Sequence, residues 1–271
     1  MAVIYILERD IINIMDDVIP VITENDVKAL TERIRKAVED TGLKGVVLGL
    51  SGGIDSAVVA KLCADAVGPE NVMCVFMPSR VTPADDYRIT TDLCARWGTE
   101  YRILDVQLAV DSLSAILATS TDTPLDRGNI AARCRMVVLF NLAKKNNKVV
   151  MGATNESEFR MGYFTKFGDG AYDISPMSGL YKTHVRQIAR ILGIPDEIIK
   201  RPPTAGLWAG QTDEGEMGIT YDDLDPVLYR MSKGASDEEI SARTGVPTEK
   251  VASVREKVAK SEHKRIPPIC P

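Results

Sequence analysis

The chain has 271 residues, of which 45% are hydrophobic, and it carries a formal net charge of -5. This length and composition suffice for one large α/β core, so we expect a single domain over residues 1–271. The acidic balance is not typical of proteins that bind nucleic acid non-specifically. The longest apolar runs, at residues 46–50 and 72–77, are far shorter than the ~20 residues of a membrane helix, and charged residues 8–10 interrupt the place of a signal-peptide core. We therefore expect a cytoplasmic protein with no membrane or nucleic-acid partner.

The hydrophobic periodicity predicts helices and strands in alternation. The first helix is expected over residues 26–40, the first strand over residues 44–50 and the next helix over residues 56–67. Further strands are expected over residues 72–77, 101–106 and 148–152, and further helices over residues 83–97, 106–118 and 128–145. This alternation is typical of a doubly wound, mostly parallel sheet with helices on both faces, a Rossmann-like α/β fold.

The strand order decides which loops meet. Ligands of doubly wound sheets bind beyond the carboxyl ends of the strands, where the strand order reverses. If the first three strands wind one way and the fourth returns beside the first, the loops after Leu50 and Gly152 share that crevice.

Five cysteines occur in the sequence, and none forms a C-x-x-C pair. Most of them lie among apolar neighbours, as buried reduced thiols do. We interpret all five as structural: Cys63, Cys74, Cys94, Cys134 and Cys270.

The most informative stretch is a glycine-rich loop between the first predicted strand and the helix that follows it. The loop consists of Gly49, Leu50, Ser51, Gly52, Gly53, Ile54, Asp55 and Ser56. Such a loop turns backbone N–H groups and the positive end of a helix toward one point, which favours a phosphate. The common P-loop places Lys and Ser/Thr after its second glycine, whereas here Asp55 would repel a bare phosphate and is better explained as a Mg2+ ligand. A plain glycine turn is the structural alternative.

The sequence Ser-Gly-Gly-x-Asp-Ser resembles the loop of the ATP pyrophosphatases, which hold the departing pyrophosphate while a substrate oxygen attacks the α-phosphorus of ATP. A second loop, residues 152–170, is dense in glycine, aromatic and charged residues. It resembles a segment of the NAD synthetases. Further segments that are similar to that family, in its order, are residues 128–136, 175–176, 180–183, 203–207, 211–214 and 262–265. The resemblance extends from about residue 46 to residue 265 and favours the ammonia-dependent, single-domain members.

The resemblance implies a fold, a reaction and a set of site residues. The fold would be that of the adenine nucleotide alpha hydrolases, and the reaction would be the ATP- and Mg2+-dependent amidation of deamido-NAD with ammonia to NAD, AMP and pyrophosphate. ATP would be bound by residues 49–56 together with Lys182 and Thr204. Mg2+ would be held by Asp55 and Glu158. Deamido-NAD would be bound by Asn129, Arg133, Lys166, Asp173, His263 and Lys264.

The resemblance also implies a catalytic base and a homodimer, and the chain departs from the family pattern at one position. Asp169 would be the base and Asp55 a second catalytic residue, although Asp169 between two glycines equally suits a simple turn. Where the family commonly has Thr after the strand glycine, this chain has Ala153, followed by Thr154. A homodimer is expected through the helix of residues 128–145, with apolar positions at Val137, Val138, Phe140 and Leu142. Residues 119–127 and 202–217 are expected to be mobile lids.

The sequence leaves two other classes of protein open. Another ATP pyrophosphatase, such as a tRNA-modifying or GMP-forming enzyme, would keep the first loop but replace the turn at residues 165–170. A DNA-binding regulator is suggested by the helix-turn-helix pattern of residues 236–258. Glu249 and Glu256 lie beside the lysines of the second helix, which favours a packing unit over a DNA reader.

Overall fold

The computed structural model describes residues 4–5, 19–117, 123–208 and 210–266. Its centre is a parallel sheet of four strands in the order β4-β3-β2-β5. The strands are β2 (Val46–Gly49), β3 (Val72–Phe76), β4 (Glu100–Ile103) and β5 (Val149–Val150). Because β5 lies beside β2 and the chain winds outward through β3 and β4, the predicted strand order is confirmed, and β2 and β5 flank the switch point.

All four strands of the central sheet are shorter than the sequence suggests: β2 covers only Val46–Gly49 of the predicted residues 44–50, and β3 ends at Phe76. The predicted strand over residues 101–106 ends at Ile103, and that over residues 148–152 is regular only at Val149–Val150. Beyond β5 the chain continues as an isolated parallel bridge between Met151 and Ile174. Ile174 belongs to β6 (Ile174–Ser175), which pairs in parallel with β1 (Ile4–Tyr5). The backbone after β5 therefore leaves the central sheet early and turns to a second one.

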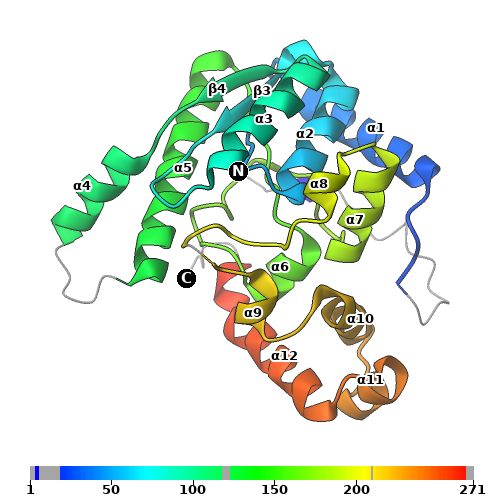
Figure 1. The fold of residues 1–271 in the computed structure, drawn as a ribbon. Helices are drawn as coiled ribbons and strands as arrows, with labels where there is room; N and C mark the ends of the chain where they lie inside the picture. Colours follow the sequence, from blue (N-terminus) through cyan, green and yellow to red (C-terminus); the bar gives the residue numbers. More distant parts are fainter. Residues whose placement is uncertain (1–3, 6–18, 118–122, 209, 267–271) are drawn as a thin grey trace, which may run out of the picture.

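Helices cover both faces of the sheet, as the sequence predicts (Figure 1). Val46 and Leu48 of β2 pack into one hydrophobic core and Val47 into another, because successive strand residues point to opposite faces. The first core is covered by α1 (Glu24–Asp40), α2 (Ile54–Val67), α3 (Ala84–Trp97) and α7 (Lys182–Ile191). The second is covered by α4 (Gln107–Leu117) and α5 (Pro124–Asn146).

Helix α5 begins four residues earlier than the sequence pattern suggests, at Pro124. Thr123 and Asp126 form a capping box, and proline occupies the first turn, where its missing N–H costs no hydrogen bond. Residues 124–127, which the sequence suggests as part of a mobile lid, are thus the first turn of a long helix. Residues 119–122 of that predicted lid lie outside the described residues.

A helical layer lies below the sheet and has its own hydrophobic core (Figure 1). It is built from α10 (Tyr221–Ser232), α11 (Asp237–Thr244) and α12 (Thr248–Lys260), followed by the short 3-10 helix η2 (Glu262–Lys264). Tyr221, Leu224 and Ile240 are fully buried there. The remaining short helices are η1 (Pro69–Asn71), α6 (Glu156–Met161), α8 (Asp196–Ile199) and α9 (Asp213–Met217). In the described part of the chain, no helix is both long and apolar enough to cross a membrane.

Candidate active site

The loop after β2 is fixed by its own two serines. The Ser51 N–H donates to Ser56 Oγ over 3.1 Å, the Gly53 N–H donates to Ser51 Oγ over 3.2 Å, and Ser56 Oγ donates to the Gly53 carbonyl over 3.1 Å. Gly52 has a φ of +85°, which favours glycine. Gly53 caps α2 without a side-chain acceptor, so N–H groups in the first turn of the helix remain free to bind an anion.

A buried cation lies between two carboxylates at the start of this helix. Lys182, the first residue of α7, is only 2% exposed. Its Nζ lies 2.6 Å from Asp55 Oδ2 and 3.3 Å from Glu158 Oε1. Asp55 follows β2 and Glu158 follows β5, so the two loops of the switch point meet as predicted. We call Asp55, Glu158 and Lys182 the charge cluster.

Asn155 connects the two acidic members of the charge cluster. Its Nδ2 donates to Asp55 Oδ1 over 2.9 Å, and its Oδ1 accepts from the Glu158 N–H over 3.0 Å. The Asn155 N–H in turn donates to Glu158 Oε2, which completes a capping box at the start of α6. Asn155 is fully buried. A residue without an assigned role in the sequence interpretation therefore sets the separation of the two carboxylates.

The charge cluster has strongly perturbed protonation equilibria. Burial, reinforced by the negative charge of Asp55, raises the pKa of Glu158 to about 8. Burial alone would lower the pKa of Lys182, but the charges of Asp55 and Glu158 outweigh it and raise that pKa above its usual range. Lys182 is therefore charged near neutral pH, and Glu158 keeps its proton to a higher pH than an ordinary glutamate does.

The two carboxylates suit a Mg2+ ion that completes its coordination with phosphate oxygens. Mg2+ typically takes one or two protein carboxylates and keeps its other positions for water and substrate phosphates. No group of three or more His, Cys, Asp or Glu with metal-binding geometry occurs within the described ranges. Asp55 and Glu158 therefore fit a metal that arrives with a nucleotide better than a metal enclosed by protein.

Two further acids near the charge cluster were not assigned from the sequence. Asp213 is 3% exposed, and its Oδ2 accepts from the Tyr221 hydroxyl over 3.1 Å. Its Oδ1 has no hydrogen-bond partner within the described chain, and burial raises its pKa. Asp225 accepts from Ser157 Oγ over 2.6 Å, and Ser157 Oγ accepts from the Lys182 N–H. The sequence marks the Gln-Thr-Asp-Glu segment, residues 211–214, as similar to the family, but its spacing indicates no role for Asp213.

Asn129 and Arg133 meet the glycine turn of the second loop. They lie one helical turn apart on α5. Thr165 Oγ1 donates to Asn129 Oδ1 over 2.8 Å, and Arg133 Nη2 donates to the Lys166 carbonyl over 3.3 Å. Arg133 is exposed, so its guanidinium is accessible to an anionic ligand. The structure thus brings together these residues of the predicted dinucleotide site.

The carboxyl-terminal segment folds back on the same turn, as the sequence interpretation required. Lys166 Nζ donates to the His263 carbonyl over 2.7 Å. Lys264 Nζ donates to the carbonyls of Gly162 and Phe164 over 2.8 and 3.0 Å. Lys264 therefore already holds the backbone of the turn, and the His263 backbone lies beside Lys166.

Three other predicted residues have local partners. Asp169 Oδ1 accepts from the Thr165 N–H over 2.8 Å, a bond typical of a turn-forming residue. The residue is exposed by surface area, and the protein packed around its carboxyl raises its pKa. Asp173 Oδ2 accepts from the Val150 N–H over 2.9 Å at the end of β5. Thr204 is exposed, and its Oγ1 accepts from the Gly206 N–H.

At the departure from the family pattern, Thr154 is buried and Ala153 packs against the core.

The described cysteines are free and buried, which confirms their structural assignment; they are Cys63, Cys74, Cys94 and Cys134. Cys270 lies outside the described residues.

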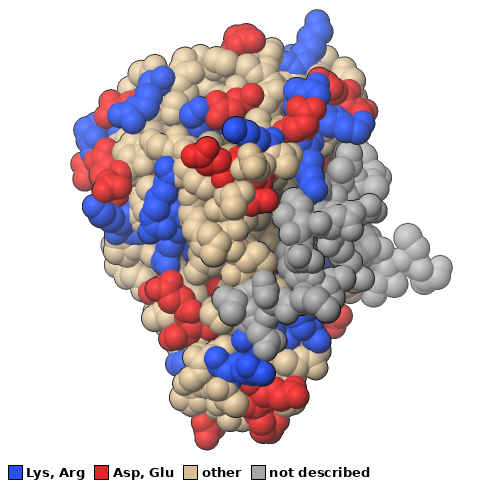
Figure 2. All heavy atoms as spheres, turned by 90° about the vertical axis from the view of Figure 1, so that its right-hand side faces the viewer, with Lys and Arg blue, Asp and Glu red and all other residues tan. Residues whose placement is uncertain are grey.

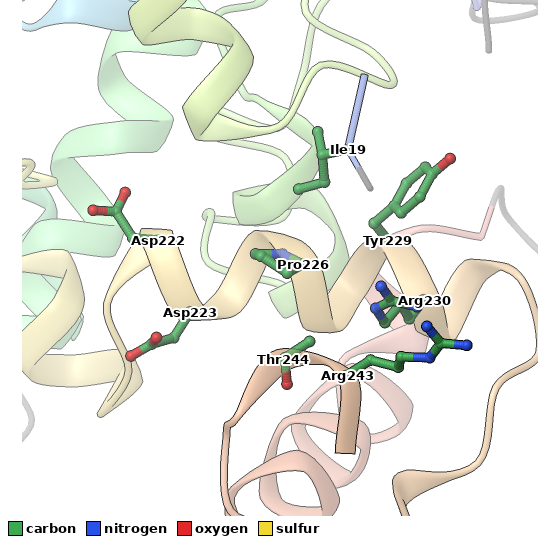
Figure 3. Close-up of a pocket in the computed structure, with 8 residues that line it drawn as sticks. All are labelled: Ile19, Asp222, Asp223, Pro226, Tyr229, Arg230, Arg243 and Thr244. Carbon is green, nitrogen blue, oxygen red and sulfur yellow. The ribbon is translucent and has the colours of Figure 1, made fainter. Parts of the chain in front are cut away.

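A separate pocket of about 270 Å³ lies along α10 (Figure 3). In the close-up, the two aspartates lie toward one end of α10 and the two arginines toward the other. The lining residues are Ile19, Asp222, Asp223, Pro226, Tyr229, Arg230, Arg243 and Thr244. None of them belongs to the glycine-rich loop or to the charge cluster, so we do not assign this pocket to the reaction.

Comparison with known proteins decides the family. The family model described as NAD synthase matches residues 26–268. The chain belongs to the NAD synthase family. The match covers the central sheet, both loops and the helical layer, which confirms the resemblance seen in the sequence. Membership in an enzyme family also decides against a DNA-binding regulator, and α11 and α12 are a packing unit of a NAD synthase fold.

Individual relatives agree with this assignment. The NH3-dependent NAD+ synthetase of Methanosarcina acetivorans is 43% identical over 244 residues, which are 89% of this chain and 95% of the relative. That of Thermococcus sibiricus is 44% identical over 243 residues, 89% of this chain and 94% of the relative. Solved structures include an NMN synthetase from Francisella tularensis, with a TM-score of 0.81 and 33% identity over 90% of this chain and 96% of that one. The NH3-dependent NAD synthetase of Campylobacter jejuni has a TM-score of 0.76 and 30% identity, with the same coverage of both chains.

Proposed function

We propose that this chain catalyses the ATP-dependent amidation of deamido-NAD with ammonia, releasing NAD, AMP and pyrophosphate. The charge cluster beside the glycine-rich loop carries this proposal. It joins Asp55 and Glu158, which suit a nucleotide-bound Mg2+, to Lys182, whose charge suits the phosphates themselves. Family membership and the names of the relatives support the same reaction.

The first step activates a poor electrophile. A carboxylate is anionic and resonance-stabilised, so ammonia does not attack it at a useful rate until one oxygen becomes part of a leaving group. The nicotinate carboxylate attacks the α-phosphorus of ATP, an adenylate forms, and pyrophosphate departs. Backbone N–H groups at the start of α2 and the ammonium of Lys182 stabilise the charge that builds on pyrophosphate. Asp55 and Glu158 would hold a nucleotide-bound Mg2+, which would supply further charge neutralisation there.

The second step transfers nitrogen. Ammonia attacks the acyl carbon of the adenylate, AMP leaves, and the nitrogen loses a proton. We propose Asp169 as the base, because its carboxyl lies in the glycine turn next to the proposed dinucleotide site and its pKa is raised. Residues 202–217 are proposed to shield the adenylate from water, and their last five residues form helix α9.

The dinucleotide is proposed to lie along α5 and the glycine turn. Asn129 and Arg133 present an amide and a guanidinium from one helix face, next to Lys166. Asp173, His263 and Lys264 lie around the same turn and strand end, and we propose that they complete the contacts with the dinucleotide. The NMN synthetase among the similar structures makes a mononucleotide the alternative substrate, and the assay below distinguishes the two.

A homodimer is part of the proposal, and exposed apolar residues of α4 and α5 support it. The two helices pack against each other, and their most exposed apolar side chains are Leu108 at 80%, Ile116 at 75% and Val137 at 61%. The sequence also suggests Val138, Phe140 and Leu142 for this surface, but these side chains are half-buried against the core. The variant Val137→Asp with Leu108→Asp should sediment as a monomer, whereas an unchanged mass would exclude this surface.

We propose that the partners are small molecules in the cytoplasm. The described cysteines are free buried thiols, a state that a reducing compartment maintains. On the face shown in Figure 2, Lys and Arg are interspersed with Asp and Glu. Among the described residues, Arg186 pairs with Asp222, and Arg88 pairs with Glu197. Such mixed charge does not form the basic stripe that nucleic acid requires.

The test is an assay of the purified chain with ATP, MgCl2 and either deamido-NAD or its mononucleotide analogue. Ammonium chloride and glutamine are supplied in separate reactions, and Asp55→Asn is the inactive control. We expect NAD, AMP and pyrophosphate from deamido-NAD and ammonium, with almost no product from glutamine. Release of ADP and phosphate, or preferred amidation of the mononucleotide, would overturn the proposed reaction or its substrate.

A further inference from the structure

An arginine that the reaction does not use lies behind the glycine-rich loop. Arg201 Nη1 donates to Asp86 Oδ1 over 2.7 Å and to the Gly52 carbonyl over 3.4 Å. The Asp86 side chain is 10% exposed and that of Arg201 33% exposed. The pair is thus largely removed from water, where an ion pair is screened less than at the surface.

Asp86 lies beside the loop at Gly52, whose φ of +85° favours glycine. A Cβ added to Gly52 would lie 3.2 Å from Asp86 Oδ1, so the carboxylate leaves little room for a side chain at this position of the loop. A bare carboxylate at this position would repel the phosphates that the loop is proposed to bind. Arg201 neutralises that charge while it donates to the loop.

The peptide between Gly52 and Gly53 is held at both ends. Its carbonyl accepts from Arg201, and its N–H, which points the opposite way in a trans peptide, donates to Ser51 Oγ over 3.2 Å. Rotation of this peptide would move the N–H groups that follow it at the start of α2. The arginine therefore acts on the loop through backbone geometry.

The same contact joins three separate segments of the chain. Asp86 lies in the first turn of α3, and Gly52 follows β2. Arg201 begins the segment that carries Thr204, which is tied to α9 by the bond from the Asp213 N–H to the Pro203 carbonyl over 3.0 Å. A change at the pair would thus reach both the phosphate loop and the segment proposed to cover the adenylate.

We propose that Arg201 and Asp86 are positioning residues that hold the Ser51–Ser56 loop in its ATP-binding shape. The inference rests on the proposed use of this loop for ATP. It concerns neither the metal ligands nor the dinucleotide site. Its specific consequence is that loss of the pair weakens ATP binding and leaves the binding of deamido-NAD unchanged.

The chain contains a matched control for this pair. Arg88 Nη2 lies 2.9 Å from Glu197 Oε2, so this second ion pair also joins α3 to the region after α7. Its side chains are 51% and 52% exposed, and neither has a recorded contact with the loop. Removal of this pair tests whether the loss of any ion pair between α3 and the region after α7 weakens ATP binding.

The experiment measures Mg-ATP binding by calorimetry and the KM values for both substrates in the full chain. Arg201→Gln should weaken ATP binding at least tenfold and raise the KM for ATP in proportion, with the KM for deamido-NAD and the melting temperature nearly unchanged. Arg201→Lys keeps the charge but loses the forked donor, so its affinity for ATP should lie between those of the parent protein and Arg201→Gln. Asp86→Asn in the Arg201→Gln background should add less than its effect alone, because the two residues act as one unit. Arg88→Gln should stay within twofold of the parent protein.

Three results would overturn the inference. They are an ATP affinity of Arg201→Gln within twofold of the parent, an equal loss for both substrates, and an equal loss in Arg88→Gln. The binding measurement does not require turnover. A parent protein that binds Mg-ATP but forms no NAD would therefore refute the proposed reaction alone, and the effect of Arg201→Gln on ATP would still decide the inference.

Discussion

Replacement of Lys182 by methionine gives a sharp test of the charge cluster. Methionine is similar in length, so it fills most of the buried space while the charge is lost, together with the cation–π contact to the Tyr221 ring, 5.1 Å from the ammonium. Asp55 and Glu158, with side chains 18% and 15% exposed, then face each other without a counter-charge. Removal of one partner from a buried ion pair costs about 3 to 5 kcal/mol. Total stability is typically about 5 to 15 kcal/mol, so the variant should unfold much more readily.

The pH dependence of this loss identifies its cause. Because Glu158 already titrates near pH 8, lowering the pH allows it to take up a proton and relieve the repulsion. Lys182→Met should therefore be less destabilised at pH 6 than at pH 8.5. Addition of MgCl2 at pH 8.5 should restore part of the stability, since the metal supplies the missing positive charge.

The assay is urea unfolding followed by circular dichroism, with EDTA or MgCl2 present. Lys61→Met is the matched control, because Lys61 forms a partly exposed pair with Asp65 one helical turn away on α2; its loss should be about 0.5 kcal/mol or less. A loss in Lys182→Met no larger than in this control would refute the account of the charge cluster. So would a loss that is greater at pH 6 than at pH 8.5.

Three further predictions follow from single residues. In the metal-free protein, the protonated Glu158 stabilises the fold fully below its unfolded pKa near 4.5, and this stabilisation is lost as pH rises through about 8; Glu158→Gln should show a flatter urea stability profile over that range and weaker Mg2+ binding by calorimetry. Arg133→Ala should raise the KM for deamido-NAD by a factor that corresponds to about 1.5 to 3 kcal/mol and leave the KM for ATP unchanged. Lys144→Ala on the same helix should change neither KM value. Asp225→Asn leaves one of its two buried donors, Ser157 Oγ or the Thr183 N–H, poorly satisfied and should cost about 1 to 3 kcal/mol in thermal or urea unfolding. A stability profile of Glu158→Gln that matches the parent protein would contradict the first prediction, and equal effects of Arg133→Ala on both KM values would contradict the second. Unchanged stability of Asp225→Asn would contradict the third.

The sheet and the phosphate loop were predictable because local patterns determine them. Apolar strand runs alternate with helical periodicity, and the glycine-rich loop follows directly on β2. The meeting of Asp55 and Glu158 also followed from the expected strand order, since loops at a switch point converge. The early start of α5 was predictable in principle from the Thr123 and Asp126 capping box, but the loop-like composition of this stretch concealed it.

The ion pairs and hydrogen bonds that hold the site residues in place could not be predicted, because they join segments that are distant in the sequence. Arg201 and Asp86 are 115 residues apart, and Ser157 and Asp225 are 68 apart. A single charged or polar residue carries no periodic signal that identifies its partner, and its choice depends on how helices pack. Asp213 shows the same limit: its motif was visible, but its buried, unpaired oxygen is a property of the folded chain.

The most direct test of the central claim follows an oxygen atom. Deamido-NAD labelled with 18O in its nicotinate carboxylate is incubated with the chain, ATP, MgCl2 and an ammonium salt, and the products are analysed by mass spectrometry. If the carboxylate attacks the α-phosphorus at the Ser51–Ser56 loop, one labelled oxygen must leave in AMP and none in pyrophosphate. Unlabelled AMP, or label in inorganic phosphate together with ADP, would contradict the account.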